Sequence, residues 1–233
     1  LKTIIMQNKS LRLLEIWCVS LVLLRIGYYN NPNALFLIWN LFLAWIPFVV
    51  SQNMNKSNSG LKQWAMASVS LLFLPNAPYI MTDLFHIKED LIAPMWFDVI
   101  LFLSFALCGM LYFLLSLEEM SKFLAKRVKP SKILELLKMF VFLLVGYGIF
   151  LGRYLRFNSW NIVSHPLDLI KGIKDSLIGP DAFNTWSISL AFAAFLYVLF
   201  HLYKGFSSQY SMEKSTGNNT STSFPNLPSQ DAE

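Results

Sequence analysis

Six apolar runs, each long enough to cross a lipid bilayer, constrain what this chain can fold into. They lie at Leu11–Tyr28, Ala34–Val50, Leu61–Ile80, Pro94–Leu117, Ile133–Leu151 and Trp186–Tyr203. A span needs about 20 predominantly apolar residues. Its backbone groups must pair within the protein, and none of these runs alternates polar and apolar residues as a barrel strand would. The sequence therefore predicts an all-α transmembrane bundle of six helices.

The composition agrees with this class and divides the chain in two. Hydrophobic residues make up 55% of the chain and charged residues 14%, which excludes an ordinary soluble domain. After Phe206 the sequence changes to Ser, Thr, Asn, Pro and Gln, which bury too little apolar surface to order a segment. We predict a transmembrane domain over residues 1–206 and a disordered polar tail over residues 207–233.

The positions of the basic residues predict the orientation. With the N-terminus in the cytoplasm, twelve Lys and Arg fall in cytoplasmic segments and five in outer segments. This orientation is favoured because positively charged loops tend to stay in the cytoplasm. Both termini are then cytoplasmic. No basic face is interleaved with aromatics on a soluble module, so we expect membrane lipids and not nucleic acid as partners.

Neither cleavage of the first run nor a disulfide is expected from the sequence. Basic residues precede the first run as in a leader peptide, but Glu15 and Arg25 interrupt it and no small-x-small site follows, so we expect it to be retained. The chain opens with Leu1, which leaves its true start open. Cys18 and Cys108 both fall inside predicted spans, and we expect no disulfide.

The third run is interrupted by Pro75 and Pro78. Pro75 arrives after about 13 residues, near 20 Å of helix, and the two prolines deprive the carbonyls of Leu71 and Leu74 of their amide donors. Asn76 carries side-chain donors that can fill this gap. Broken helices mark binding sites in transporters; the alternative is a kink that serves packing alone.

A short amphipathic segment, Tyr79–Leu91, follows the break. At 100° per residue its polar side chains share one face and its apolar ones the adjacent face, which predicts an interfacial helix on the outer side. The polar face carries Tyr79, Asp83, His86 and Asp90. Asp83 and His86 could act as an orienting carboxylate and a general base, or the face could be simply hydrated or salt-bridged.

Asp98 and two arginines lie on the same outer side. A carboxylate at the edge of hydrocarbon needs a partner, and Arg153 and Arg156 are the candidates. These arginines follow Gly148 and Gly152, whose spacing predicts close packing of the fifth helix. Arg153 and Arg156 could instead capture a phosphate or carboxylate.

A second interfacial helix is predicted near residue 165. Ser164 can cap it and Pro166 suits its first turn. His165 lies next to the cap. A metal site would draw on Asp83, His86, Asp98 and His165, although two ligands three residues apart are a weak signal; any cofactor otherwise stays unknown.

Long sequence blocks resemble one known family. They are Asn40–Pro47, Leu74–His86, Trp96–Asp98 and Gly152–Trp160. These blocks are similar to those of the bacterial integral membrane proteins grouped as domain of unknown function 1361 (DUF1361), over roughly Leu11 to Lys204. The family pattern leads us to expect Asp where this chain has Asn161. The resemblance implies a multi-pass protein of the bacterial cytoplasmic membrane and carries no activity with it.

Three functions fit these observations. The first is binding of an anionic lipid headgroup or small anion at an outer-interface site, with transport as an extension; its residues are Arg153, Arg156, Asn76, Asn158, Tyr79 and Asp98. The second is a membrane enzyme acting on a lipid or isoprenoid substrate, with Asp83 and His86 as the catalytic pair or a metal at the site. The third is a structural or assembly partner whose polar groups form a satisfied network.

Overall fold

The computed structural model describes residues 2–88, 93–129 and 131–220, and these contain helices and no strands. Side chains are described for residues 9–85, 93–129 and 131–209. The elements are α1 (Lys2–Tyr29), η1 (Pro32–Ala34), α2 (Leu35–Met54), α3 (Gly60–Phe73), α4 (Asn76–Tyr79), η2 (Ile80–Lys88), α5 (Met95–Ala125), α6 (Ser131–Arg153), α7 (Asn161–Ser164), α8 (Pro166–Ile178) and α9 (Ala182–Thr220). The all-α prediction is confirmed.

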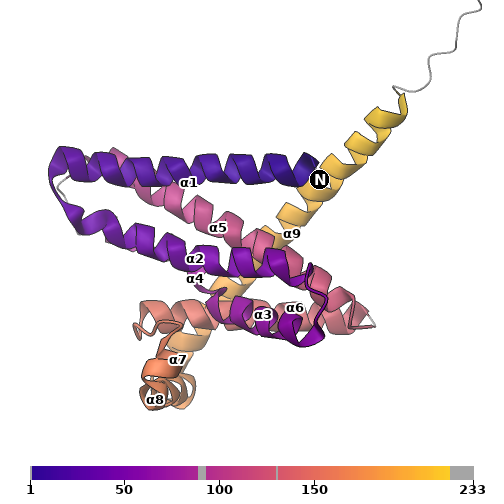
Figure 1. The fold of residues 1–233 in the computed structure, drawn as a ribbon. Coiled ribbons are helices and arrows are strands. Elements are labelled where there is room, and N and C mark those ends of the chain that lie inside the picture. Colours follow the sequence, from indigo (N-terminus) through magenta and orange to yellow (C-terminus); the bar gives the residue numbers. More distant parts are fainter. Residues whose placement is uncertain (1, 89–92, 130, 221–233) are drawn as a thin grey trace, which may run out of the picture.

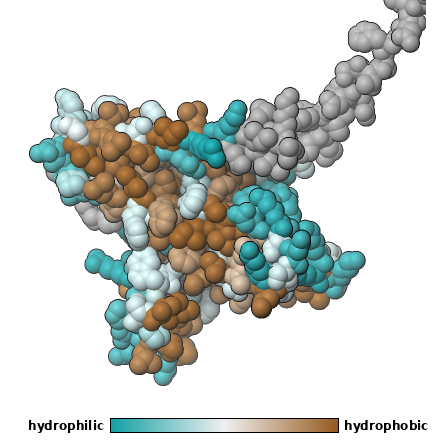
Figure 2. Space-filling view, viewed as in Figure 1, coloured by the Kyte–Doolittle hydropathy of each residue, from teal (hydrophilic) through white to brown (hydrophobic). Residues whose placement is uncertain are grey.

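Five stretches in the described part of the chain are helical, long and apolar enough to cross a membrane. They are Pro32–Met54, Gly60–Phe85, Met95–Ala125, Ser131–Arg153 and Ala182–Gln209. The helix α1 is also long, but Arg12, Glu15 and Arg25 interrupt its apolar sequence, and it is not among the five. Figure 2 shows hydrophobic residues across the middle of the visible face, as a bundle surrounded by lipid requires.

The helix α5 is the centre of the bundle. In α5, 61% of the most apolar stretch is buried, against 39% or less in the other four spans. It contacts α1, α2, α4 and η2, while α6 packs mainly on α9. Figure 1 shows α1, α2 and α5 running alongside one another, with α7 and α8 near the start of α9. The core thus surrounds α5 and includes Phe105, Tyr112 and Phe113.

The third span is broken where the prolines predicted. The helix α3 ends at Phe73, and the chain continues as the short α4 and then as the 3₁₀ helix η2. Two glycines of α6 make room for this segment: a Cβ at Gly148 would lie 2.6 Å from Pro75 Cγ, and one at Gly152 would lie 3.1 Å from the Tyr79 ring. The close packing predicted from Gly148 and Gly152 is confirmed, and its partner is the break itself.

The two amphipathic segments differ in detail from the prediction. Thr82 and Asp83 of η2 are buried, so the predicted polar face is not a hydrated surface along its described part. The segment is a 3₁₀ helix and not an α-helix. The second segment, α8, begins with Pro166 at its first position as predicted, but the residue before it is His165, because Ser164 already ends α7.

The last helix is longer than its apolar sequence. It continues past Phe206, where the sequence predicted the tail to begin, and is helical to Thr220. The remaining part of the predicted tail, 221–233, lies outside the described residues.

Candidate functional site

A cavity of about 360 Å³ lies beside the break in the third span. Its walls come from α2, from both sides of the break, from α6 and from the segment that runs from Phe157 into α8. The apolar side chains are Leu43, Leu71, Leu72, Pro75, Leu144, Leu151, Phe157, Ile162, Leu169 and Ile173; the polar ones are Asn40, Asn76, Tyr79, Tyr147, Asn158 and Ser159. None of these lining residues carries a charge.

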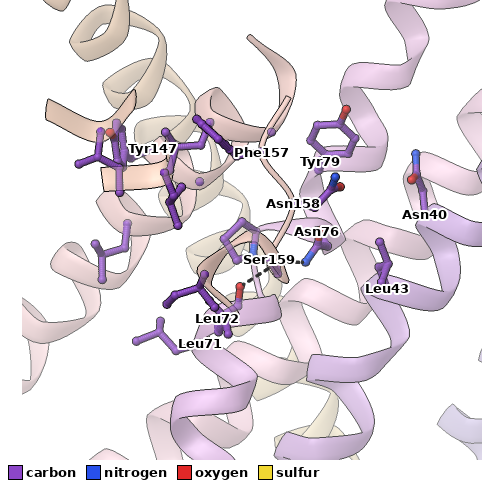
Figure 3. A pocket seen from close by; sticks show the side chains of 18 residues that line it. Asn40, Leu43, Leu71, Leu72, Asn76, Tyr79, Tyr147, Phe157, Asn158 and Ser159 are labelled. Carbon is purple, nitrogen blue, oxygen red and sulfur yellow. Dashed lines mark hydrogen bonds between the residues drawn. The ribbon is translucent and has the colours of Figure 1, made fainter. Parts of the chain in front are cut away.

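Most of the polar groups are gathered on one side of the cavity, whereas Tyr147 lies on the other (Figure 3). Figure 3 shows Tyr79, Asn158, Asn76 and Asn40 on that side, and Tyr147 and Phe157 on the other. The apolar walls and the polar cluster together give the cavity an amphipathic lining. Ligand pockets in proteins commonly combine apolar walls with a few polar groups that orient the ligand, and about 300 Å³ is near the lower end of their size range.

Asn76 and Ser159 repair the backbone at the break. Asn76 Nδ2 donates to the carbonyl of Phe73 at 3.0 Å and to Ser159 Oγ at 2.9 Å, and Ser159 Oγ donates to the carbonyl of Leu72 at 3.2 Å. Carbonyls left open by a helix break are expensive in an apolar environment. Asn76 thus supplies a donor at the break, but the carbonyl that it serves is that of Phe73 and not that of Leu71 or Leu74. The carbonyl of Leu74 accepts instead from Ala77 N at 3.2 Å. Ser159 ties the segment after α6 to the same break.

A buried carboxylate lies behind the polar cluster. Asp83 is 1% exposed, and its Oδ2 accepts a hydrogen bond from Asn40 Nδ2 at 2.8 Å. Arg153 Nη1 lies 3.7 Å from Asp83 Oδ1. The guanidinium of Arg153 also lies 5.3 Å from the centre of the Phe85 ring. An aspartate of the segment after the break and an arginine at the end of α6 therefore meet.

The second arginine is presented differently. Because α6 ends at Arg153, the two arginines do not lie one turn apart on a helix. Arg156 is exposed, and its φ of 56° is left-handed, a conformation that costs a non-glycine residue about 1–2 kcal/mol. Phe157 N donates to the carbonyl of Leu151 at 3.1 Å and closes the turn around it. Arg156 forms no ion pair with the side chains that the structure describes.

The comparison with protein families matches residues 39–211 to the description "Protein of unknown function (DUF1361)". The chain belongs to this family. The match begins at residue 39 and not near Leu11, so α1 lies outside it. No curated protein and no solved structure matched the chain.

All the residues that line the cavity lie within the part matched to the DUF1361 family. Four of the predicted ligand-binding residues are near it: Asn76, Tyr79 and Asn158 line it, and Arg156 precedes the lining residue Phe157. At the position where we expected Asp, Asn161 Oδ1 accepts a hydrogen bond from Asn158 N at 2.6 Å. Asp and Asn both carry a side-chain Oδ1, and this oxygen is the acceptor that the turn requires.

Asp98 lies elsewhere in this DUF1361 protein. Its partner is neither Arg153 nor Arg156 but Arg25 of α1, whose Nε lies 2.9 Å from Asp98 Oδ1. Asp98 is 2% exposed and does not line the cavity. The sequence had shown Arg25 only as an interruption of the first run, because nothing in the run itself names its partner.

The predicted catalytic and metal-binding residues are not brought together by what the structure describes. His86 and Asp90 have side chains outside the described residues. His165 is exposed and its Nδ1 lies 2.9 Å from Ser164 Oγ. Among the described residues, no group of three or more His, Cys, Asp or Glu could hold a metal ion. The roles of His86 and His165 stay predictions.

Three residues of the site were not singled out from the sequence. Asn40 is the amide that joins the cavity to Asp83, Ser159 completes the helix break, and Tyr147 OH lies 2.9 Å from Ser176 Oγ of α8. A usable signal existed for Asn40, since an amide within an apolar span usually hydrogen-bonds across helices.

Proposed function

We propose that this chain is a six-span protein of the bacterial cytoplasmic membrane that binds the anionic headgroup of a lipid in the cavity beside the broken third span. In this proposal α1 is the sixth span, both termini are cytoplasmic, and the cavity opens toward the outer side. The amphipathic lining is the observation that carries the proposal, and transport of the ligand is an extension of it.

The side chains of α1 support a sixth span. Leu13, Ile16 and Leu23 are exposed by 69%, 63% and 60%, whereas Arg25 is 3% exposed. Glu15 is also turned inward, because its Oε1 accepts a hydrogen bond from Tyr112 OH at 2.7 Å. A helix that turns Arg25 and Glu15 inward and exposes its aliphatic side chains suits lipid and not water.

The walls of the cavity support a lipid as the ligand. Leucines of α2, α3 and α6 and isoleucines of α7 and α8 line the cavity, so an apolar chain would replace water there favourably. The polar side then meets the headgroup with Tyr79 and Asn158.

Arg156 is the proposed partner of the negative charge. It is exposed, has no ion pair in the described part of the structure, and holds a strained backbone directly before Phe157 of the cavity wall. Strain of this kind often accompanies a functional position. Arg153 keeps Asp83 neutralised behind the cluster, so in this proposal it positions Asn40 and does not hold the ligand itself.

Filling the cavity tests the proposal. Leu144→Trp would occupy part of the space, whereas Leu136→Trp places the same side chain on the exposed face of the same helix. We expect native mass spectrometry of the detergent-purified protein to show retained anionic lipid in the wild type and in Leu136→Trp, and at least tenfold less in Leu144→Trp. Equal retention in all three would contradict binding in this cavity.

The charge is tested separately. Arg156→Gln removes the cation, and Lys171→Gln removes an exposed cation of α8 that does not line the cavity. A hydrogen bond to a charged group contributes about 1.5–3 kcal/mol, so we expect roughly tenfold or greater weakening for Arg156→Gln and little change for Lys171→Gln. Equal effects of the two substitutions would mean that Arg156 acts only through the general surface charge and does not contact the ligand.

A further inference from the structure

Two amide side chains of the cavity have fixed orientations. Asn40 Nδ2 donates to Asp83 Oδ2 at 2.8 Å. An ionised carboxylate only accepts hydrogen bonds, and Asp83 lies beside the guanidinium of Arg153, with Nη1 3.7 Å from Oδ1. The nitrogen of Asn40 must therefore face Asp83. Because the amide is planar, its oxygen is directed away from Asp83, toward the side of the cavity where Asn158 and Tyr79 lie (Figure 3).

Asn76 is fixed in the same way. Its nitrogen donates to the carbonyl of Phe73 and to Ser159 Oγ, which uses both of its hydrogens. Ser159 donates its own hydrogen to the carbonyl of Leu72, so it can only accept from Asn76. Exchanging the oxygen and nitrogen of this amide would set oxygen against oxygen. Asn76 therefore turns its Oδ1 away from the repaired backbone.

The cavity consequently offers two acceptor oxygens whose hydrogen-bonding capacity is unused. Among the described residues, Asn40 Oδ1 and Asn76 Oδ1 accept no hydrogen bond. The oxygens of a phosphate placed against them would be repelled, because phosphate and amide oxygens are both acceptors. No cation lines the cavity to compensate for this repulsion. A hydroxyl group satisfies such an oxygen, because it donates one hydrogen and carries no charge.

We propose that the ligand is an anionic lipid whose headgroup carries hydroxyl groups, such as a glycerol or a sugar, and that these hydroxyls donate to Asn40 Oδ1 and Asn76 Oδ1. This inference rests on the proposed function. The phosphate stays at Arg156, outside the uncharged cluster, and the hydroxylated end reaches inward. A headgroup of glycerol size is compatible with a cavity of about 360 Å³.

Two lipids of equal charge test this inference. Phosphatidylglycerol and phosphatidylethanol both carry one negative phosphodiester, and the second lacks the hydroxyls. A neutral hydrogen bond contributes about 0.5–1.5 kcal/mol, so we expect the wild-type protein to bind phosphatidylglycerol roughly three- to tenfold more tightly, measured by competition in native mass spectrometry. Equal binding of both lipids would overturn the hydroxyl assignment and leave the lipid site intact. Binding of neither would overturn the proposed function.

A variant pair ties the preference to its residue. Asn40→Leu removes the acceptor, and Asn53→Leu makes the same change near the end of the same helix, away from the cavity. We expect the preference for phosphatidylglycerol to fall at least twofold in Asn40→Leu, where Asn76 Oδ1 remains as an acceptor, and to be unchanged in Asn53→Leu. An undiminished preference in folded Asn40→Leu would overturn the role of Asn40. If that variant does not fold, the wild-type comparison still decides the inference.

A soluble competitor separates the two sources of such a headgroup. Glycerol 3-phosphate carries the hydroxyls and the phosphate without the apolar chains. We expect it to displace phosphatidylglycerol only at concentrations at least a hundredfold higher, because it cannot use the leucine and isoleucine walls. Displacement at equal concentrations would overturn the assignment to a lipid.

Discussion

Arg25 of α1 and Asp98 of α5 form a two-pronged ion pair inside the bundle. Arg25 Nε lies 2.9 Å from Asp98 Oδ1 and Nη2 lies 3.4 Å from Oδ2. Both side chains are 3% exposed. The pair joins α1, which lies outside the region matched to the family, to the central helix of that region. It is therefore a principal polar attachment of α1 to the rest of the protein.

Replacing one partner of this ion pair should destabilise the protein much more than replacing both partners together. Removal of one partner of a buried ion pair leaves an uncompensated charge and typically costs about 3–5 kcal/mol, whereas replacing both by hydrophobic residues is often nearly neutral. We expect Arg25→Leu and Asp98→Leu each to unfold at much lower temperature in detergent. The double variant should recover most of the difference.

A half-exposed pair provides the control. In α6, Lys138 Nζ lies 2.6 Å from Glu135 Oε1, and the Glu135 side chain is 50% exposed. Such pairs contribute about 0–1 kcal/mol, so Glu135→Leu should change the unfolding temperature little. A double variant of Arg25 and Asp98 as unstable as the two single variants added together would contradict the buried-pair interpretation.

The sequence predicted the need of Asp98 for a partner but not the identity of that partner. A carboxylate at the edge of an apolar span requires compensation, and this much is local. Which arginine supplies it depends on how α1 docks, and α1 and α5 are separated in the chain by three α-helices and two 3₁₀ helices. The sequence does contain one signal for this contact. Charged residues inside an apolar run, such as Arg25 and Glu15, are expected to face the protein interior and not lipid.

The contact between Gly148 and Pro75 should tolerate no added methyl group. A Cβ at Gly148 would lie 2.6 Å from Cγ and 2.7 Å from Cβ of the rigid Pro75 ring. We expect Gly148→Ala to destabilise the protein by about 1–3 kcal/mol, as overpacking does. In Gly27→Ala nothing lies within 4 Å of the new atom, and a helical Gly→Ala change is expected to stabilise by about 0.5–1 kcal/mol. Thermal unfolding of both variants gives the comparison, and equal shifts would contradict this packing.

The repair of the helix break can be measured by a double-mutant cycle. Asn76→Ala leaves the carbonyl of Phe73 without its donor and removes the bond to Ser159. Leaving a buried acceptor unpaired costs about 1–3 kcal/mol. We expect Ser159→Ala to cost less, and the two together to cost less than their sum, because they share a hydrogen bond. Asn58→Ala, at an exposed position, is the control. Strict additivity would mean that the shared bond contributes nothing.

The position of the break was readable from local sequence, whereas the cavity beside it was not. Pro75 and Pro78 remove amide donors that an unbroken continuation of α3 would need, and Asn76 is the nearest side chain able to serve a freed carbonyl. The cavity arises because the segment after α6 folds back over the break through Ser159. That return depends on the left-handed turn at Arg156, and arginine gives no sequence signal for a left-handed conformation.

The orientation of the bundle can be read by labelling single cysteines in intact cells. Cys18 and Cys108 are both buried, with no exposed surface, so the wild-type protein should not react and serves as the background. We expect Lys171→Cys, on exposed α8, to react with a membrane-impermeant maleimide added from outside. Lys126→Cys, in the exposed turn after α5, should react only after the cells are opened, because the excess of Lys and Arg predicts that this turn is cytoplasmic. Labelling of both positions from the same side would contradict a membrane crossing by α6, which lies between them, and would remove the outer placement of the cavity.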